Sequence, residues 1–394
     1  MGGGRGSPDE ARASGASGNR NINRKRFRKR VRFPSAVEPV FLRSAPVPSP
    51  RPVTASTTPR RRAGRWRAAA LAALVLAGCG GERDVTVLRL GHALDVEHPV
   101  HLGMEVMAER LDSLSGGTLH IDLYPSEQLG SEREMLELLQ IGTLGMTKVS
   151  AAVLENFAPA YRVFGLPYVF RDDAHRFAVL DGPIGDALLA STAPYRLRGL
   201  AFYDAGSRSF YTVDEPALAP EDLGGQKIRV MESATAMDMV RSLGGSPTPI
   251  PWGELYTSLQ QGVVDGAEHN PPSYYLSGHY EVARHFVLDE HTAIPDVLVV
   301  GSTLWDRLDA QQRAWLQEAA DASAVVQRRL WREATEEALA AVEAEGVEVV
   351  RPDKSPFEAA VGPMLAEAAR DADLRLLLDR IRATAPPDSA QADV

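Results

Sequence analysis

Apolar and polar residues alternate in several short stretches of the chain, and segments with a helical period separate these stretches. The clearest strand is TLHIDLY, in which Leu119, Ile121 and Leu123 fall on one face. A helix with defined ends precedes it, because Pro99 is a start signal and Gly116–Gly117 is a stop signal. The strands predicted for this first half cover residues 85–93, 118–124 and 144–150.

This alternation of strands and helices predicts an α/β fold built from parallel βαβ units. Ser131 and Glu134 form a capping box for a second helix, which Gly142 ends. The pattern restarts near residue 200, where GLAFYDAG, SFYTV and QKIRVM are predicted strands and two more helices follow. The chain is therefore predicted to contain two α/β units side by side.

One helical stretch is much longer than the others. Asp309 is its predicted N-cap, and about 36 residues without Pro or interior Gly follow, or roughly 54 Å at the rise of an α-helix. A helix of that length could contact both units and brace them. The alternative is two helices with a break near Ala322–Ser323.

The charge of the chain is unevenly distributed. Residues 1–78 carry 17 of the 43 Lys and Arg but 3 of the 52 Asp and Glu, which leaves 26 basic and 49 acidic residues in the remainder, a balance of −23. An acidic body of this kind argues against binding to a phosphate backbone, so no nucleic-acid partner is predicted. Residues 1–59 lack an apolar period, and we expect them to form a disordered basic leader.

Residues 60–79 have the pattern of a lipoprotein signal peptide. An arginine cluster precedes the apolar run AAALAALVLAGC, which is too short to span a bilayer. The tetrapeptide LAGC ends in Cys79, the only cysteine, so Cys79 is predicted to be lipid-modified after cleavage; the alternative is a short apolar helix with an incidental cysteine. No Met lies between Met1 and Met104, and so long a leader favours a mis-assigned translation start.

Motifs for catalysis and for cofactor or metal binding are missing from the sequence. It has no phosphate-binding GxxxxGK[ST] loop, no GxGxxG after a strand and no GxSxG elbow. The nine His include no HExxH motif, and one Cys cannot build a thiolate site; His98 and His101 could share a helix face, but such pairs are mostly surface residues. We therefore predict no metal, no cofactor and no enzymatic activity.

The strand KIRV contains an arginine among apolar neighbours. Ile228 and Val230 point to one face of this strand and Arg229 points to the other. A guanidinium in a core needs an anion, because a buried charge is costly unless it is paired. That anion could be an internal acid, such as Glu232 or Asp222, or a ligand from outside the protein.

Three motifs in order, QLGSERE, KIRV and SPTPIPWGELYTSLQQGVVDGAE, resemble those of the solute-binding subunits of tripartite ATP-independent periplasmic (TRAP) transporters. The resemblance extends from about Leu88 to Phe357. It implies a two-lobed Venus-flytrap fold of α/β lobes with a long helix spanning both, and an organic acid bound in the cleft. It places lobe I at 85–205 plus about 295–333, lobe II at 206–294 plus about 334–385, and a flexible tail at 386–394.

The resemblance also implies ligand-binding residues. The family arginine that pairs the ligand carboxylate corresponds to Arg229, and a second family arginine corresponds to Arg208. The asparagine after the DGxE turn corresponds to Asn270, and it follows His269, which stands where several members carry a different residue. The remaining candidates are His92, Trp252, Lys148 and Ser150, with Asp296 as an acceptor for ligand hydroxyls.

Each of these residues has a structural alternative. Arg208 could be a surface arginine, Trp252 a core residue at a helix start, Asn270 part of a turn, and His92 a satisfied residue at a strand end. The many polar candidates favour a polyhydroxylated sugar acid, such as a uronate or aldonate, while C4-dicarboxylates and 2-oxo acids stay open.

The resemblance implies a receptor that passes its ligand to a small and a large membrane subunit. A ligand sensor of the same fold is the alternative. We further expect a monomer held outside the cytoplasmic membrane by the lipid on Cys79.

Overall fold

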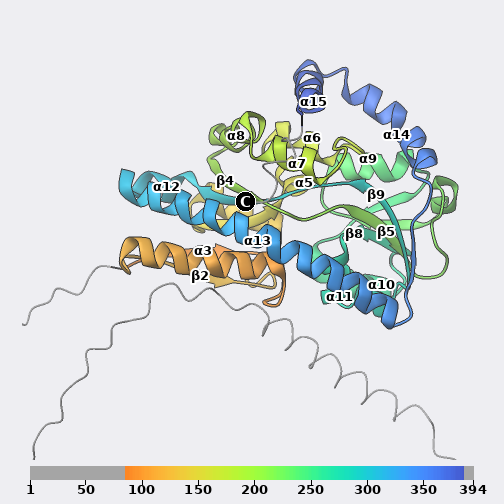
Figure 1. Cartoon of the computed structure of the whole chain (residues 1–394), viewed down its shortest axis with the longest axis horizontal. Coiled ribbons are helices and arrows are strands. Elements are labelled where there is room, and N and C mark those ends of the chain that lie inside the picture. Colours follow the sequence, from red (N-terminus) through yellow and green to blue (C-terminus); the bar gives the residue numbers. More distant parts are fainter. Residues whose placement is uncertain (1–84, 386–394) are drawn as a thin grey trace, which may run out of the picture. The chain divides into compact units, whose positions relative to one another are not determined.

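The computed structural model describes residues 85–385, and its strands form two separate sheets (Figure 1). We call each sheet, with the helices packed on it, a lobe. The first sheet has the order β2-β1-β3-β10-β4, with β1 (Thr86–Gly91), β2 (Leu119–Tyr124), β3 (Met146–Ser150), β4 (Leu197–Tyr203) and β10 (Asp296–Gly301). The second has the order β11-β9-β5-β8-β6-β7, with β5 (Arg208–Thr212), β6 (Lys227–Val230), β7 (Ser246–Pro249), β8 (Gly266–His269), β9 (His285–Thr292) and β11 (Glu348–Val350). The predicted two-lobed α/β fold is confirmed.

The predicted parallel units are present, but both sheets are mixed because each also contains antiparallel pairs. Strand β1 runs parallel to β2 and β3, as βαβ units require, but β10 runs antiparallel to β3 and β4. The reason lies in the path of the chain. It leaves the first sheet at the end of β4 and returns at the start of β10, so Tyr203 and Asp296 face each other on oppositely directed strands.

The helices of lobe I follow the predicted local signals. Helix α3 (Pro99–Ser115) ends at Gly116 with a left-handed φ of 59°, and α4 (Glu132–Ile141) begins with the Ser131–Glu134 capping box. Both faces of the first sheet are buried: Val297 and Val299 of β10 belong to one apolar cluster, and Leu298 and Val300 belong to another. The other helices here are α5 (Ala151–Leu154), α6 (Arg162–Gly165), α7 (Asp173–Leu180), α8 (Pro183–Ala190) and α12 (Ser302–Arg307), with 3-10 turns η1 (Pro159–Tyr161) and η2 (Ala193–Tyr195).

Lobe II packs its own helices around the second sheet. Phe210 and Tyr211 are neighbours on β5, and because side chains alternate along a strand they enter two different apolar clusters. The helices are α9 (Ala234–Ser242), α10 (Leu255–Gln260), α11 (Pro271–Leu276) and α14 (Ser355–Ala368), with 3-10 turns η3 (Pro220–Leu223), η4 (Trp252–Glu254) and η5 (His279–Glu281).

Helix α13 (Ala310–Ala344) is one continuous helix of 35 residues that contacts both lobes (Figure 1). Its N-cap is Asp309, as predicted, and Gln312 completes a capping box. The alternative of a break near Ala322–Ser323 is wrong. Ser323 fits inside the helix because its hydroxyl donates to Ala320 O and accepts from Tyr203 Oη.

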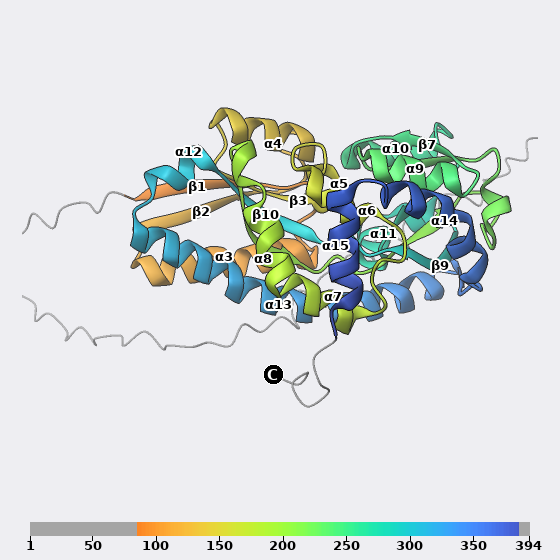
Figure 2. The ribbon, with the colours of Figure 1, turned by 90° about the horizontal axis from the view of Figure 1, so that it is seen from above.

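The C-terminal helix α15 (Ala372–Ala383) packs with lobe I, whereas the predicted boundary assigned residues up to 385 to lobe II. Its apolar face, with Leu374, Leu378 and Ile381, joins the cluster that contains Phe164 and Phe202. Figure 2 shows α14 beside the elements of lobe II and α15 next to α6 and α7. The link between α14 and α15 is therefore another place where the chain crosses between lobes.

The predicted leader, the signal peptide and Cys79 lie outside the described residues. Within residues 85–385, none of the helices has both the length and the apolar character that a membrane span needs.

Candidate functional site

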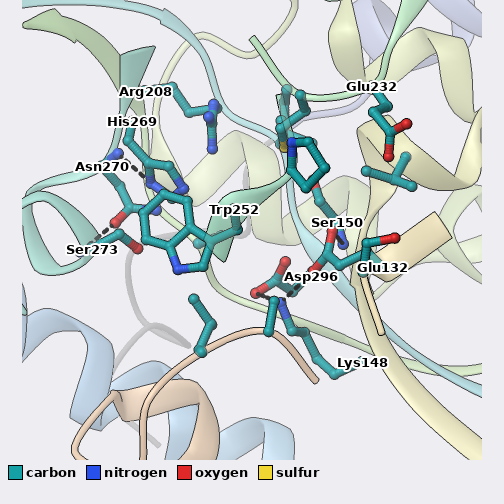
Figure 3. Close-up of a pocket in the computed structure, with 18 of the residues that line it drawn as sticks. Glu132, Lys148, Ser150, Arg208, Glu232, Trp252, His269, Asn270, Ser273 and Asp296 are labelled. Atoms are coloured by element: carbon teal, nitrogen blue, oxygen red, sulfur yellow. Dashed lines mark hydrogen bonds and ion pairs between the residues drawn. The ribbon is translucent and has the colours of Figure 1, made fainter. Parts of the chain in front are cut away.

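A pocket lies where the two lobes face each other, and both contribute to its wall (Figure 3). The space in it that water molecules can occupy has a volume of ≈ 60 Å³, and the whole hollow, including its opening to solvent, measures ≈ 640 Å³. This first volume holds only a few waters, so a six-carbon acid needs the wider space of the open hollow or walls that move apart. The polar lining residues are His98, Glu127, Ser131, Glu132, Lys148, Ser150 and Asp296 from lobe I, and Arg208, Arg229, Glu232, Trp252, His269, Asn270 and Ser273 from lobe II.

Arg229 is the one lining cation that lacks an acidic partner among the described residues. Its side chain is almost fully buried; Nε donates to Ile250 O at 2.8 Å, and Nη1 has no hydrogen-bond partner. Of the two internal acids that could have paired it, Glu232 lines the pocket without reaching Arg229, and Asp222 accepts from Ala219 N. Burial lowers the pKa of Arg229, which reflects the cost of holding this charge without a counter-ion.

Arg208 is buried rather than exposed, so the alternative of a surface arginine is wrong. Nε and Nη2 both bind the carboxylate of Glu268, and Nη2 also donates to Glu268 O at 2.8 Å. Arg208 lines the pocket, but two of its nitrogens are already occupied by Glu268. The predicted contact between Arg208 and a ligand remains a prediction.

The Arg208–Glu268 pair continues into a buried chain of charges. His291 Nε2 lies 3.6 Å from Glu268 Oε2, and its Nδ1 lies 2.8 Å from Asp289 Oδ2. Burial lowers the pKa of His291, but Asp289 and Glu268 outweigh burial and raise it to about 9. Burial raises the pKa of Glu268, but the charges and hydrogen bonds of Arg208 and His291 outweigh burial and lower this pKa to about 2. The positive charges of Arg208 and His291 are thus balanced by the negative charges of Glu268 and Asp289.

Trp252 lines the pocket and also packs against apolar side chains. The indole lines the pocket, with the Cζ of Arg229 5.8 Å from its ring centroid, and it also packs against apolar clusters of both lobes. The ring of His269 lies 4.5 Å from it, centroid to centroid. Trp252 therefore packs against the cores and also forms part of the pocket wall, and its contact with a ligand remains a prediction.

His269 is a pocket residue that the sequence did not single out. Its Nδ1 accepts a hydrogen bond from Asn270 N at 2.9 Å, so in the neutral ring the proton sits on Nε2. Burial, with the charges of Arg208 and Arg229, lowers the pKa of His269 well below its usual value and keeps it neutral. Its position at the end of β8, directly after Glu268, is the signal that could have identified it.

Asn270 acts as the N-cap of α11 and also lines the pocket. Its Oδ1 accepts from Ser273 N at 2.9 Å, so its local role is that of a helix N-cap and not the predicted alternative of a turn residue. Ser273 Oγ in turn lies 3.1 Å from His98 Nε2, across the two lobes. His98 and Ser273 were missed as pocket residues, because their partnership spans 175 positions of sequence.

Lys148, Ser150 and Asp296 lie together on the opposite wall. Lys148 Nζ lies 2.9 Å from Glu132 Oε1 and 3.2 Å from Asp296 Oδ2, and Ser150 N donates to Glu132 Oε2 at 3.1 Å. Burial lowers the pKa of Lys148, but the two acids raise it overall, so Lys148 is charged. Burial raises the pKa of Asp296 despite Lys148. The structure thus brings the three predicted residues together with a fourth, Glu132.

His92 does not lie among the pocket-lining residues, which corrects its predicted placement. It is completely buried, with Nε2 2.9 Å from His101 Nδ1, and its Nδ1 accepts from Leu94 N. Both ring nitrogens of His92 have hydrogen-bond partners within the protein, as the alternative interpretation of a residue at a strand end predicted.

Metal-ligating side chains do not cluster in the part of the chain that the structure describes: no three His, Cys, Asp or Glu there are arranged to hold an ion. The donor set at the pocket consists of guanidinium, imidazole and amide groups facing carboxylates. Such an arrangement suits hydrogen bonding to an oxygen-rich anion.

Comparison with known proteins places this geometry in a family. The family model "Bacterial extracellular solute-binding protein, family 7" matches residues 90–371. A curated solute-binding protein from Chromohalobacter salexigens is 33% identical over 268 residues, which cover 68% of this chain and 80% of that protein.

Two solved structures are similar over the same region. A TRAP periplasmic solute-binding protein from Bradyrhizobium sp. BTAi1, in complex with α/β-D-galacturonate, is 42% identical with a TM-score of 0.75; the match covers 76% of this chain and 100% of that one. One from Roseobacter denitrificans, with bound β-D-glucuronate, is 36% identical with a TM-score of 0.74 and the same coverage. The chain therefore belongs to family 7 of the bacterial extracellular solute-binding proteins, the TRAP-transporter receptors that its sequence motifs resemble.

Proposed function

We propose that the protein captures a sugar acid, with a hexuronate favoured, in the pocket between its lobes and delivers it to the membrane subunits of a TRAP transporter. The unpaired guanidinium of Arg229 is the observation that carries this proposal. Its Nη1 is buried without a partner, and a carboxylate matches the planar fork of an arginine with two parallel hydrogen bonds. The missing counter-ion would then be the ligand.

The same charge gives a reason for the lobes to close on a ligand. When the lobes are apart, water can hydrate Arg229; when they close without an anion, the charge is desolvated and unpaired. A carboxylate that contacts both walls makes the closed state favourable, because it binds that state more tightly than the open one. In this proposal the lobes are residues 85–205 with 295–333, and 206–294 with 334 onward, except that α15 moves with lobe I.

Two observations favour a sugar acid over a simple one. The wall opposite Arg229 offers Glu132, Lys148 and Asp296, which can bind hydroxyl groups, and Trp252 offers a flat apolar surface suited to the CH face of a sugar ring. The similar proteins from Bradyrhizobium and Roseobacter hold a galacturonate and a glucuronate. C4-dicarboxylates and 2-oxo acids are the competing ligands.

The remaining features of the proposal concern location and assembly. The protein would act in the periplasm as a monomer, anchored by lipid on Cys79. It would bind its ligand without converting it, since the family consists of binding proteins.

A thermal-shift and calorimetric screen of the purified protein tests the proposal. The panel is D-galacturonate, D-glucuronate, D-galactonate, succinate and pyruvate. A true ligand at 100 times its Kd raises the free energy of unfolding by about 2.7 kcal/mol. Recovery of the ligand unchanged after long incubation is expected. If none of these acids stabilises the protein, the proposal is wrong.

A further inference from the structure

The pocket is electrically polarised, and this polarity restricts the ligand more narrowly than the presence of one arginine does. In Figure 3, Arg208, His269, Asn270 and Ser273 lie on one side of Trp252, and the acidic side chains lie on the other side and below it. The lobe II wall presents hydrogen-bond donors. The lobe I wall, together with Glu232, presents carboxylates.

The donor wall has one net positive charge to offer a ligand. Arg208 is neutralised by Glu268, and His291 is balanced by Asp289, so the free charge is that of Arg229. His269 adds a donor without adding a charge, because Asn270 N occupies its Nδ1 and leaves the proton on Nε2. This end suits one carboxylate together with a neighbouring neutral oxygen.

The opposite wall carries an excess of negative charge. Lys148 is its only cation in the described lining, and Glu132 and Asp296 both bind it, at 2.9 and 3.2 Å. Glu127, whose Oε2 accepts from Gly253 N, and Glu232 add two more carboxyl groups. Burial and the neighbouring Glu132 raise the pKa of Glu127, the direction expected where carboxylates crowd together.

A second ligand carboxylate at that wall would find no free cation. Lys148 is already shared by two acids, and its remaining N–H can serve a neutral oxygen. Hydroxyl groups fit instead, because each carboxylate oxygen of Glu132 makes one hydrogen bond and keeps further lone pairs for a donor from the ligand.

We propose, resting on the function proposed above, that the pocket accepts polyhydroxy acids with one carboxylate and rejects the dicarboxylate of the same carbon skeleton. The pocket thus distinguishes a uronate, which has a hydroxyl at carbon 1, from the corresponding aldarate, which has a carboxylate there. Like charges that meet across a binding surface cost several kcal/mol, so the aldarate binds on the order of 100-fold more weakly at pH 7.

Calorimetric titration of the purified protein with D-galacturonate, D-galactonate and galactarate at pH 7 tests this selectivity. The expected result is binding of a monocarboxylic acid at least about 100-fold tighter than that of galactarate. In Glu132→Gln, which removes one charge and keeps the shape, the ratio is expected to shrink by about tenfold. Glu137→Gln is the matched control, because Glu137 lies half exposed on the same helix in a surface pair with Arg133.

The outcomes separate this inference from the function on which it rests. If galactarate binds as tightly as galacturonate, the proposed selectivity is wrong. If Arg229→Met then loses the binding of both acids, the proposed function of carboxylate capture by Arg229 still stands. If no acid of either kind binds, both are overturned. An unchanged ratio in Glu132→Gln, with the protein still folded, overturns the assignment of the selectivity to the acidic wall.

Discussion

The side chain of Gln327 binds both backbone polar groups of Asp204. Its Oε1 accepts from Asp204 N and its Nε2 donates to Asp204 O, each at 2.8 Å, and the side chain is completely buried. Asp204 begins the crossing from β4 to β5, and Gly206, two residues on, has φ 59° with its Cα facing the indole of Trp331. The middle of α13 therefore holds the chain where it passes between the lobes.

Replacement of Gln327 by Met should destabilise the protein, because it leaves a buried N–H and a buried C=O without partners. Each of the two unsatisfied groups costs about 1–3 kcal/mol, so we expect the free energy of unfolding to fall by about 2–6 kcal/mol in urea titrations. Val325→Ala on the same helix is the control, since Val325 is 67% exposed and should change stability by less than about 0.5 kcal/mol. Equal stability of the two variants would contradict the role of Gln327.

The sequence predicted what local signals encode. The caps at Asp309 and Ser131 and the stops at Gly116 and Gly142 all lie within a few residues of the helices they delimit, and all are present. The family followed from three motifs in order. Local chemistry also placed Arg229 on a strand among apolar residues.

The sequence could not predict contacts between distant positions. Arg208 and Glu268 are 60 residues apart, so nothing near Arg208 showed that its charge is already paired. His92 pairs with His101, which lies on the next helix. The residues next to either histidine in the sequence do not show that the two rings are in contact. The antiparallel insertion of β10 and the return of α15 to lobe I depend on the path of the whole chain, which alternating patterns do not specify.

Arg229→Met should weaken ligand binding strongly and leave the ligand-free protein folded. The loss of a buried ion pair with the ligand costs about 3–5 kcal/mol, or roughly 10²–10³-fold in Kd. Stability without ligand should change little, because the variant loses the bond to Ile250 O but also removes a buried charge with no counter-ion.

Calorimetry and thermal unfolding of Arg229→Met beside Arg241→Met check this prediction. Arg241 is 57% exposed and paired with Asp238 on the surface of α9, so its replacement should alter neither quantity. Ligand affinity at the wild-type level in Arg229→Met would remove the basis of the proposed function.

Cys79→Ala should release the protein from the membrane fraction. The predicted lipid attaches to this cysteine, and the body of the protein would then have no covalent anchor. Fractionation of cells followed by immunoblotting measures the distribution of the two forms. Membrane retention of the alanine variant at the level of the unmodified sequence would contradict lipid attachment at this position.

The buried histidines make stability depend on pH in opposite directions on the two sides of about pH 6.5. Burial lowers the pKa of His92, His98 and His269 well below the usual value, and that of His279 to about 3. Below pH 6.5 the unfolded chain takes up protons at these sites and the folded protein does not. Stability therefore falls with acidification, by up to about 1.4 kcal/mol per pH unit for each histidine.

His291 acts in the other direction, because its folded pKa is raised to about 9. Its contribution is complete below pH 6.5 and is lost as the pH rises from 6.5 to 9, where the unfolded chain has released the proton that the folded protein keeps. Urea titrations between pH 5 and 9 should show a maximum near pH 6.5. The decline should be steeper on the acid side, because four histidines contribute to it and His291 alone contributes to the alkaline decline. His291→Gln should flatten the alkaline decline and leave the acid decline in place. An alkaline decline that persists unchanged in this variant would show that His291 is not protonated in the folded protein.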